Sequence, residues 1–173
     1  MRMPVIQNSR AMTRMTGQGE IRSLCTLHDA RFIINDRLDI ALAALADGVH
    51  LGQDDLPLSA ARRLAPRPFI IGISVGTVEE AVLAEREGAD YIGVGPVYPT
   101  GTKTDAGPAV GPDLVRLIRK EVTIPIVAIG GINLLNVRDV VTAGADWIAV
   151  ISAVICSPDI EAASRKFVTL INS

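Results

Sequence analysis

One short pattern recurs three times in the chain and limits the folds that it can adopt. Ala-Asp stands directly before a hydrophobic run at residues 46–52 (ADGVHLG), 89–95 (ADYIGVG) and 145–151 (ADWIAVI). Short runs rich in Val and Ile occur at six places in all: residues 31–35, 48–52, 69–74, 91–95, 125–130 and 147–152. Between them lie amphipathic stretches such as residues 77–88, where Gly88 marks the end of a helix. This alternation predicts right-handed βαβ units and a parallel sheet.

The positions of the polar residues distinguish the two common parallel folds. Polar and glycine residues follow successive runs at 35–36, 53–55, 74, 100–103, 130–131 and 152, so they lie at the carboxyl end of every predicted strand. A doubly wound sheet has one Gly-rich switch point, whereas a barrel builds its site from all of its βα loops. The sequence therefore favours a TIM (β/α)8-type barrel.

The start of the chain is too short for a complete barrel of this kind. Only about 30 residues precede the first clear strand, and one βα unit needs roughly 20 or more. Residues 19–30 read as a helix, and residues 1–30 as a whole form an atypical N-terminal segment. We expect an α/β fold, a single domain over residues 1–173, truncated at its N-terminus to about six clear βα units. The sequence leaves open whether a second copy of the chain, in a homo-oligomer, seals the gap in the barrel.

Composition excludes several classes of partner. The chain has 17 Lys and Arg against 19 Asp and Glu, and no basic block that could follow a nucleic-acid backbone. Its two cysteines, Cys25 and Cys156, lack the spacing of a metal site or a disulfide framework, which predicts reduced thiols. No hydrophobic run approaches about 18 residues, and the start lacks a signal core. We expect a cytoplasmic protein that binds small molecules and neither nucleic acid nor membrane.

Two aspartates are candidate metal ligands. Asp36 and Asp55 follow neighbouring predicted strands, which lie about 4.8 Å apart in a sheet. Mg²⁺ characteristically takes one or two carboxylates and completes its shell with waters and phosphate oxygens. The alternative is that Asp36 and Asp54-Asp55 only cap the helices that follow, since Asp is a preferred N-cap residue. Taken alone, these residues leave both interpretations open.

Three loops are candidate phosphate sites. Gly130-Gly131 and Ile151-Ser152 follow the last two strands, where barrels bind phosphate with backbone N–H groups, although two glycines can also simply form a tight turn. The loop GVGPVYPTGTKTDAGP (93–108) places Lys103 among Thr100, Gly101 and Thr102. It has about 15 residues without a secondary-structure pattern, and loops of that length are usually functional. Together with the aspartates, these loops predict substrates that carry more than one phosphate group.

Several longer segments are similar to the thiamine phosphate synthase family. They are residues 32–64, which contain NDR and HLGQDDLP, residues 70–81, residues 88–108 with GPVYPTGTKTDAG, residues 125–132 with IGGI, and residues 144–154. The resemblance covers roughly residues 20–170 in order. It implies a transferase that joins a hydroxymethylpyrimidine diphosphate to a hydroxyethylthiazole phosphate and releases diphosphate, with Mg²⁺ assistance and a dissociative mechanism.

The resemblance also implies roles for individual residues. Asn35 contacts the pyrimidine substrate, and Asp36 and Asp55 bind Mg²⁺. Ser74 and Lys103 hold the diphosphate and are the expected catalytic residues. The thiazole phosphate is then bound by the remaining set, Thr100, Gly101, Thr102, Gly131, Ile151 and Ser152. His50 is expected to be a packed histidine rather than a general base, because the implied reaction needs little proton transfer.

The chain departs from the family pattern at three points. Nothing in residues 1–30 reproduces the Gln-x-Arg-x-Lys stretch whose cations grip the diphosphate in that family. Gly76 stands where the family often has His, and Leu45 replaces the usual Gly before Ala46-Asp47, where we expect a small local strain. The alternatives are a non-catalytic phosphate-binding remnant of the family, and a thiazole tautomerase-like isomerase, which typically has His where this chain has Pro96.

Overall fold

The computed structural model describes residues 16–102 and 107–172. These residues form two compact units. The first comprises residues up to Ser74 together with Arg86–Asp90, and the second comprises Val75–Glu85 and residues from Tyr91 onward. The prediction of a single domain stays a prediction.

The first unit contains three parallel strands and the helices between them. Its elements are α1 (Thr16–Leu27), β1 (Ile33–Asn35), α2 (Leu38–Ala43), β2 (Gly48–Leu51), α3 (Leu58–Leu64) and β3 (Ile70–Val75), whose last residue is counted with the second unit. β1 pairs with β2 and β2 with β3, all in parallel. Asn35 is opposite His50 in this register, so the carboxyl ends of β1 and β2 lie side by side.

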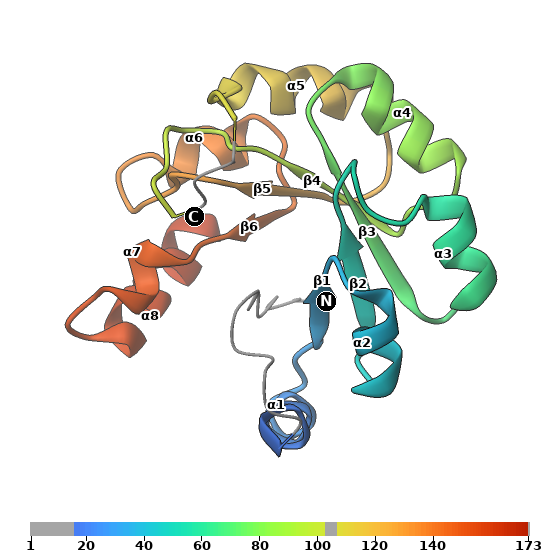
Figure 1. Cartoon of the computed structure of the whole chain (residues 1–173). Helices are drawn as coiled ribbons and strands as arrows, with labels where there is room; N and C mark the ends of the chain where they lie inside the picture. Colours follow the sequence, from blue (N-terminus) through green and yellow to red (C-terminus); the bar gives the residue numbers. More distant parts are fainter. Residues whose placement is uncertain (1–15, 103–106, 173) are drawn as a thin grey trace. The chain divides into compact units, whose positions relative to one another are not determined.

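The core of this unit is made of large strand residues packed against small helix residues. Ile33, Val49 and Ile71 are buried in the strands, while Ala41 of α2 and Ala61 of α3 are fully buried in the helices. Figure 1 shows α2 and α3 on the same side of β2 and β3. Alanine lets a helix approach the strands closely, so the hydrophobic runs of the sequence become continuously buried strands.

The second unit repeats the same arrangement. Its elements are α4 (Val78–Arg86), β4 (Tyr91–Val94), α5 (Gly111–Glu121), β5 (Ile126–Ile129), α6 (Val137–Thr142), β6 (Trp147–Ala149), α7 (Ser152–Ile155) and α8 (Ile160–Ile171). β4, β5 and β6 pair in parallel in this order. All six predicted strands are therefore present, and the helix expected at residues 19–30 begins and ends about three residues earlier, as α1.

Local sequence explains where the long helices of this unit begin and end. Thr77 accepts a hydrogen bond from the backbone N–H of Glu80, and the Glu80 carboxylate accepts one from the N–H of Gly76. This pair resembles a capping box, except that the returning bond comes from the N–H one residue before Thr77. Gly88, with φ of +91°, follows the end of α4 as predicted. Asp159 caps α8 by accepting from the N–H of Ala162.

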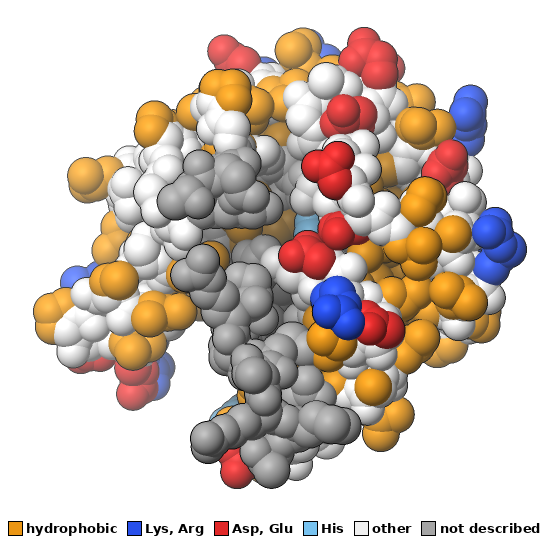
Figure 2. Space-filling view, in the orientation of Figure 1, with side chains coloured by type: hydrophobic (Ala, Val, Ile, Leu, Met, Phe, Trp, Pro, Cys, Tyr) orange, Lys and Arg blue, Asp and Glu red, His pale blue; other side chains and the backbone are white. Residues whose placement is uncertain are grey.

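The last strand is less buried than its sequence suggests. All four residues of β4 are buried, whereas the three residues of β6 are only half-buried. Hydrophobic side chains also stay exposed on α7 and α8, as the orange surface over these helices shows in Figure 2; they are Ile155, Ile160 and Val168. Among the described strands, β6 pairs only with β5. The continuous apolar run at residues 147–152 therefore forms an edge strand.

Candidate active site

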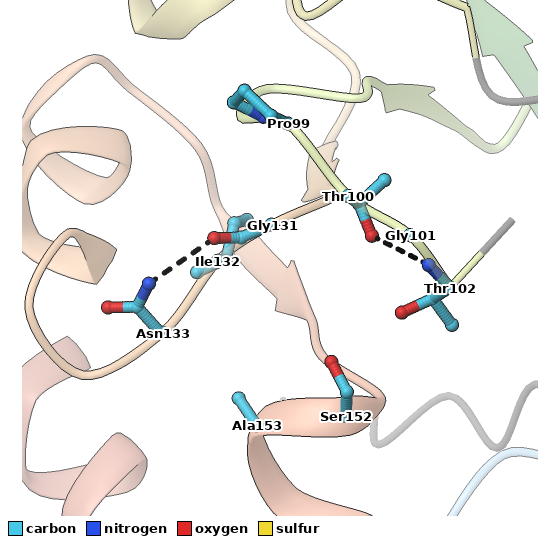
Figure 3. Close-up of a pocket in the computed structure, with 9 residues that line it drawn as sticks. All are labelled: Pro99, Thr100, Gly101, Thr102, Gly131, Ile132, Asn133, Ser152 and Ala153. Carbon is cyan, nitrogen blue, oxygen red and sulfur yellow. Dashed lines mark hydrogen bonds between the residues drawn. The ribbon is translucent and has the colours of Figure 1, made fainter.

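A pocket of about 520 Å³ lies at the carboxyl ends of the strands of the second unit. It is formed by the loops after β4 and β5 and by the start of α7 (Figure 3). Its lining residues are Pro99, Thr100, Gly101, Thr102, Gly131, Ile132, Asn133, Ser152 and Ala153. The structure thus brings together five of the residues predicted to bind the thiazole phosphate, from three separate loops.

Glycine is required at the floor of this pocket because the two loops touch there. Gly131 has a φ of +62°, and a Cβ atom on it would lie 2.5 Å from the carbonyl oxygen of Pro99. Gly130 has a φ of +96°, and its Cβ would lie 2.6 Å from Pro96. The N–H of Tyr98 donates to the carbonyl of Gly130, which joins the loops directly. Gly130-Gly131 is therefore more than a tight turn, since it allows a close approach of two backbones.

Hydroxyl groups face the pocket from two sides. Thr100 Oγ1 accepts a hydrogen bond from the N–H of Thr102 at 3.2 Å, which curls the loop after β4. Ser152 is the first residue of α7, and in Figure 3 its hydroxyl points toward the space between the two loops. Ile151, predicted to bind phosphate, is the N-cap residue of α7 and does not line the pocket. Hydroxyl donors on two sides of one pocket suit an anion.

Sequence reasoning missed Asn133. Its Nδ2 donates to the carbonyl of Gly131 at 3.5 Å (Figure 3), and its Oδ1 accepts from the N–H of Leu135 at 2.8 Å. Asn136 makes the matching bonds: its Oδ1 accepts from the N–H of Asn133 and its Nδ2 donates to Gly131. The two asparagines spaced by three after the glycine pair were the available signal, because Asn side chains stabilise turns of this kind.

Tyr98 ties the same two loops together from outside the pocket lining. Its hydroxyl donates to the carbonyl of Asn136 at 3.4 Å. Burial of the ring raises the pKa of Tyr98, and the negative charge of Asp139 adds to this rise. The hydroxyl therefore stays protonated and remains a donor at neutral pH.

The remaining predicted residues lie at the carboxyl ends of β1, β2 and β3, in the first unit. Asn35 ends β1, and Asp36 follows it with a φ of 65° while its N–H donates to the carbonyl of His50 at 2.8 Å. Asp55 is half-buried in the loop after β2, where its Oδ2 accepts from the N–H of Gly52 at 2.7 Å. Lys103 lies outside the described residues.

Neither aspartate occupies the N-cap position of the helix that follows it. The N-cap residues of α2 and α3 are Arg37 and Pro57, and neither makes a side-chain capping bond. The N-cap positions expected for Asp36 and for Asp54-Asp55 are therefore held by other residues. Arg37 instead pairs with Asp39, whose pKa falls to about 2 because of the hydrogen bond from that guanidinium.

The donor set at these strand ends is compatible with Mg²⁺. Two carboxylates and the amide of Asn35 are hard oxygen ligands, and the bond from Gly52 engages only Oδ2 of Asp55. In the part of the chain that the structure describes, no group of three or more His, Cys, Asp or Glu side chains is placed to hold a metal ion. A metal here needs water or phosphate oxygens to complete its shell.

Comparison with known proteins decides the family. The model of the family "Thiamine monophosphate synthase" matches residues 7–154. The chain belongs to the thiamine monophosphate synthase family. A thiamine-phosphate synthase from Methanospirillum hungatei is 82% identical over 151 residues, which cover 87% of this chain and 73% of that protein. The resemblance predicted from the sequence motifs is confirmed.

Solved structures agree with this family assignment. A thiamine phosphate pyrophosphorylase from Pyrococcus furiosus superposes with a TM-score of 0.86 at 42% identity, covering 98% of this chain and 82% of that one. A 3-hexulose-6-phosphate synthase from Salmonella typhimurium reaches a TM-score of 0.75 at 19% identity, covering 97% and 86%, which shows the shared fold alone. The predicted α/β barrel-type fold is confirmed. The described helices include none long and apolar enough to span a membrane.

Proposed function

We propose that this member of the thiamine monophosphate synthase family joins a hydroxymethylpyrimidine diphosphate to a hydroxyethylthiazole phosphate. The products are thiamine phosphate and diphosphate. The observation that carries the proposal is the 82% identity to a protein named thiamine-phosphate synthase, over 87% of this chain. At such identity the substrate-binding loops are expected to keep their function.

The pocket of the second unit is the proposed site for the thiazole phosphate. Thr100, Thr102 and Ser152 offer hydroxyl donors, and Gly131 lets the loops after β4 and β5 come close together around them. Gly101 lies in open space at the edge of this pocket, since nothing is within 4 Å of a Cβ built there.

The carboxyl ends of β1 to β3 are the proposed site for the pyrimidine diphosphate. Asn35 contacts the pyrimidine, Ser74 donates to the diphosphate, and Asp36 and Asp55 hold Mg²⁺. When bound, Mg²⁺ supplies positive charge that stabilises the departing diphosphate. Ser74 and Lys103 stabilise the same negative charge as it develops. The C–O bond of the pyrimidine methylene then breaks, and the thiazole nitrogen forms the new C–N bond without a nucleophilic side chain.

The test is formation of thiamine phosphate from the two substrates, with and without Mg²⁺, in the wild type and in Asp55→Asn. The amide of this variant still accepts the Gly52 N–H bond but lacks the negative charge. We expect Mg²⁺-dependent turnover to fall about 100-fold, the scale on which one preorganised electrostatic group acts. The free energy of unfolding should stay unchanged.

Asp54→Asn is the matched control, because Asp54 is the exposed neighbour in the same loop. It should retain wild-type turnover. Equal activity of Asp55→Asn and the wild type would reject the metal assignment, and a wild type that forms no product would reject the proposed function itself.

A further inference from the structure

Ser74 is held at two of its atoms by side chains from the neighbouring strand and its loop. Its Oγ lies 2.9 Å from Nε2 of His50, and its carbonyl oxygen accepts a hydrogen bond from Nε2 of Gln53 at 2.5 Å. His50 is in β2, and Gln53 lies two residues beyond the end of that strand. A single segment of four residues therefore fixes both the side chain and the backbone of Ser74.

The position of His50 follows from the strand register. His50 is opposite Asn35, the last residue of β1, on one side and Gly72 of β3 on the other, and it lies one residue before the end of β2. Glycine opposite leaves room for the half-buried imidazole beside Ser74. His50 is also tied to the loop after β1, because its carbonyl accepts from the N–H of Asp36.

We propose that His50 is a positioning residue for the hydroxyl of Ser74, and that Gln53 supports it by fixing the Ser74 backbone. This inference rests on the proposed function, in which Ser74 donates to the diphosphate. A serine hydroxyl has one hydrogen to donate and can accept from another group. In the tautomer that this proposal requires, Nε2–H of His50 donates to Oγ, which leaves the hydroxyl hydrogen of Ser74 to point at a phosphate oxygen.

A general-base role does not suit this geometry. The proposed reaction breaks a C–O bond and forms a C–N bond, and neither step removes a proton from a substrate. A base beside Ser74 would have nothing to accept, whereas an oriented hydroxyl stabilises the leaving diphosphate. The packed histidine expected from the sequence is thus a residue that acts through Ser74.

The experiment compares His50→Leu, His50→Gln, Ser74→Ala and the double variant His50→Leu/Ser74→Ala. Two kinds of measurement are made. Steady-state kinetics gives kcat and the KM for each substrate, and calorimetry gives the affinity for inorganic diphosphate in the presence of Mg²⁺. We expect His50→Leu to lower kcat/KM for the pyrimidine diphosphate about 10-fold, the effect of weakening one charged hydrogen bond, with the KM for the thiazole phosphate unchanged. Diphosphate affinity should fall in parallel.

Two further results distinguish positioning from a structural role. His50→Leu should cost nothing more in the Ser74→Ala background, because the residue it orients is gone. His50→Gln should recover most of the loss, since its amide can donate to Oγ from a side chain of similar length. Additive losses in the double variant, or a Gln variant no better than Leu, would overturn the proposal.

His28→Leu is the matched control, because His28 is exposed just after α1 and should keep wild-type kinetics. If His50→Leu does not fold, Gln53→Leu replaces it; this change at an exposed residue removes the amide donor without adding a charge, and a smaller loss of diphosphate affinity is expected. Diphosphate binding also separates the two ideas. If diphosphate binding depends on His50 but no thiamine phosphate forms, the proposed function is rejected and this inference is kept. If diphosphate binding is the same in the His50 and Ser74 variants as in the wild type, this inference is overturned.

Discussion

At the scale of single residues, one backbone conformation departs from what its side chain prefers. Leu45 has a φ of 53°, in the left-handed region, and its side chain is 77% exposed. The sequence predicts strain here, because the family usually has Gly at this position, and the positive φ confirms that glycine would fit. A left-handed residue with a Cβ costs roughly 1–2 kcal/mol, and an exposed leucine gains little burial in return.

Leu45→Gly should therefore stabilise the protein. Relief of the left-handed conformation outweighs the entropy that glycine loses on folding, so we expect the free energy of unfolding to rise by about 0.5–1 kcal/mol. Urea unfolding at 25 °C measures it. Leu45→Ala is the control, since it keeps the Cβ atom and should differ from wild type by less than about 0.5 kcal/mol. An equal gain in both variants would show that the exposed side chain, not the backbone, is at fault.

At the scale of elements, the Ala-Asp repeat has a common structural role. Asp47, Asp90 and Asp146 each directly precede a strand. Each accepts a hydrogen bond of 2.8 Å from a backbone N–H at or near the start of the preceding strand in the chain. The donors are Phe32, Ile71 and Ile126. Each aspartate also pairs with at least one arginine, such as Arg22 with Asp47. The repeat thus fixes the amino-terminal ends of the strands, opposite the candidate active site.

Asp47→Asn tests how much the negative charge of Asp47 contributes to stability. Burial alone would raise the pKa of Asp47, but the hydrogen bonds from Arg22 and the Phe32 N–H, with the charges of Arg22 and Arg31, hold that pKa below its usual value. A lowered folded-state pKa stabilises the protein above the unfolded-state pKa, 3.8 for this group, and this stabilisation disappears as pH falls through the lower value. We expect the variant to lose about 1 kcal/mol at pH 7, the difference between a charged and a neutral hydrogen bond.

The measurement is denaturant unfolding of wild type and Asp47→Asn between pH 7 and pH 2. The difference between the two should be constant down to about pH 4 and should shrink below it. Asp113→Asn serves as the control, because that side chain is 85% exposed and should show no such trend. A gap that persists unchanged to pH 2 would mean that the charge of Asp47 is not its cause.

At the scale of the whole molecule, the proposed sites fall in different compact units. The thiazole phosphate pocket belongs entirely to the second unit, and Asn35, Asp36, Asp55 and Ser74 belong to the first. Each substrate therefore has a distinct set of backbone amides to protect. This division follows the order of the chain, since the four residues from Asn35 to Ser74 precede Val75 and the pocket residues all follow Tyr91.

Hydrogen exchange of the intact chain can test this assignment. The thiazole phosphate should slow exchange in residues 129–133 and 151–154, whereas inorganic diphosphate with Mg²⁺ should slow it in residues 35–37 and 52–55, because ligands suppress local opening where they bind. Diphosphate without Mg²⁺ is the control and should protect the second set less. Protection of the same residues by both ligands would contradict the two-site assignment.

The sequence by itself determined the six strands found in the described residues, their parallel class and five of the residues that line the pocket. Six Val- and Ile-rich runs and the repeated Ala-Asp are local signals, and strand burial and βα connection are local physics. Only the tertiary structure decided what depends on neighbours in space. It made β6 a half-buried edge strand, placed Asn133 in the pocket while Ile151 stayed out of the lining, and set His50 and Gln53 against Ser74. These contacts join residues about 20 positions or more apart or depend on how loops pack, and no periodicity along a chain encodes them.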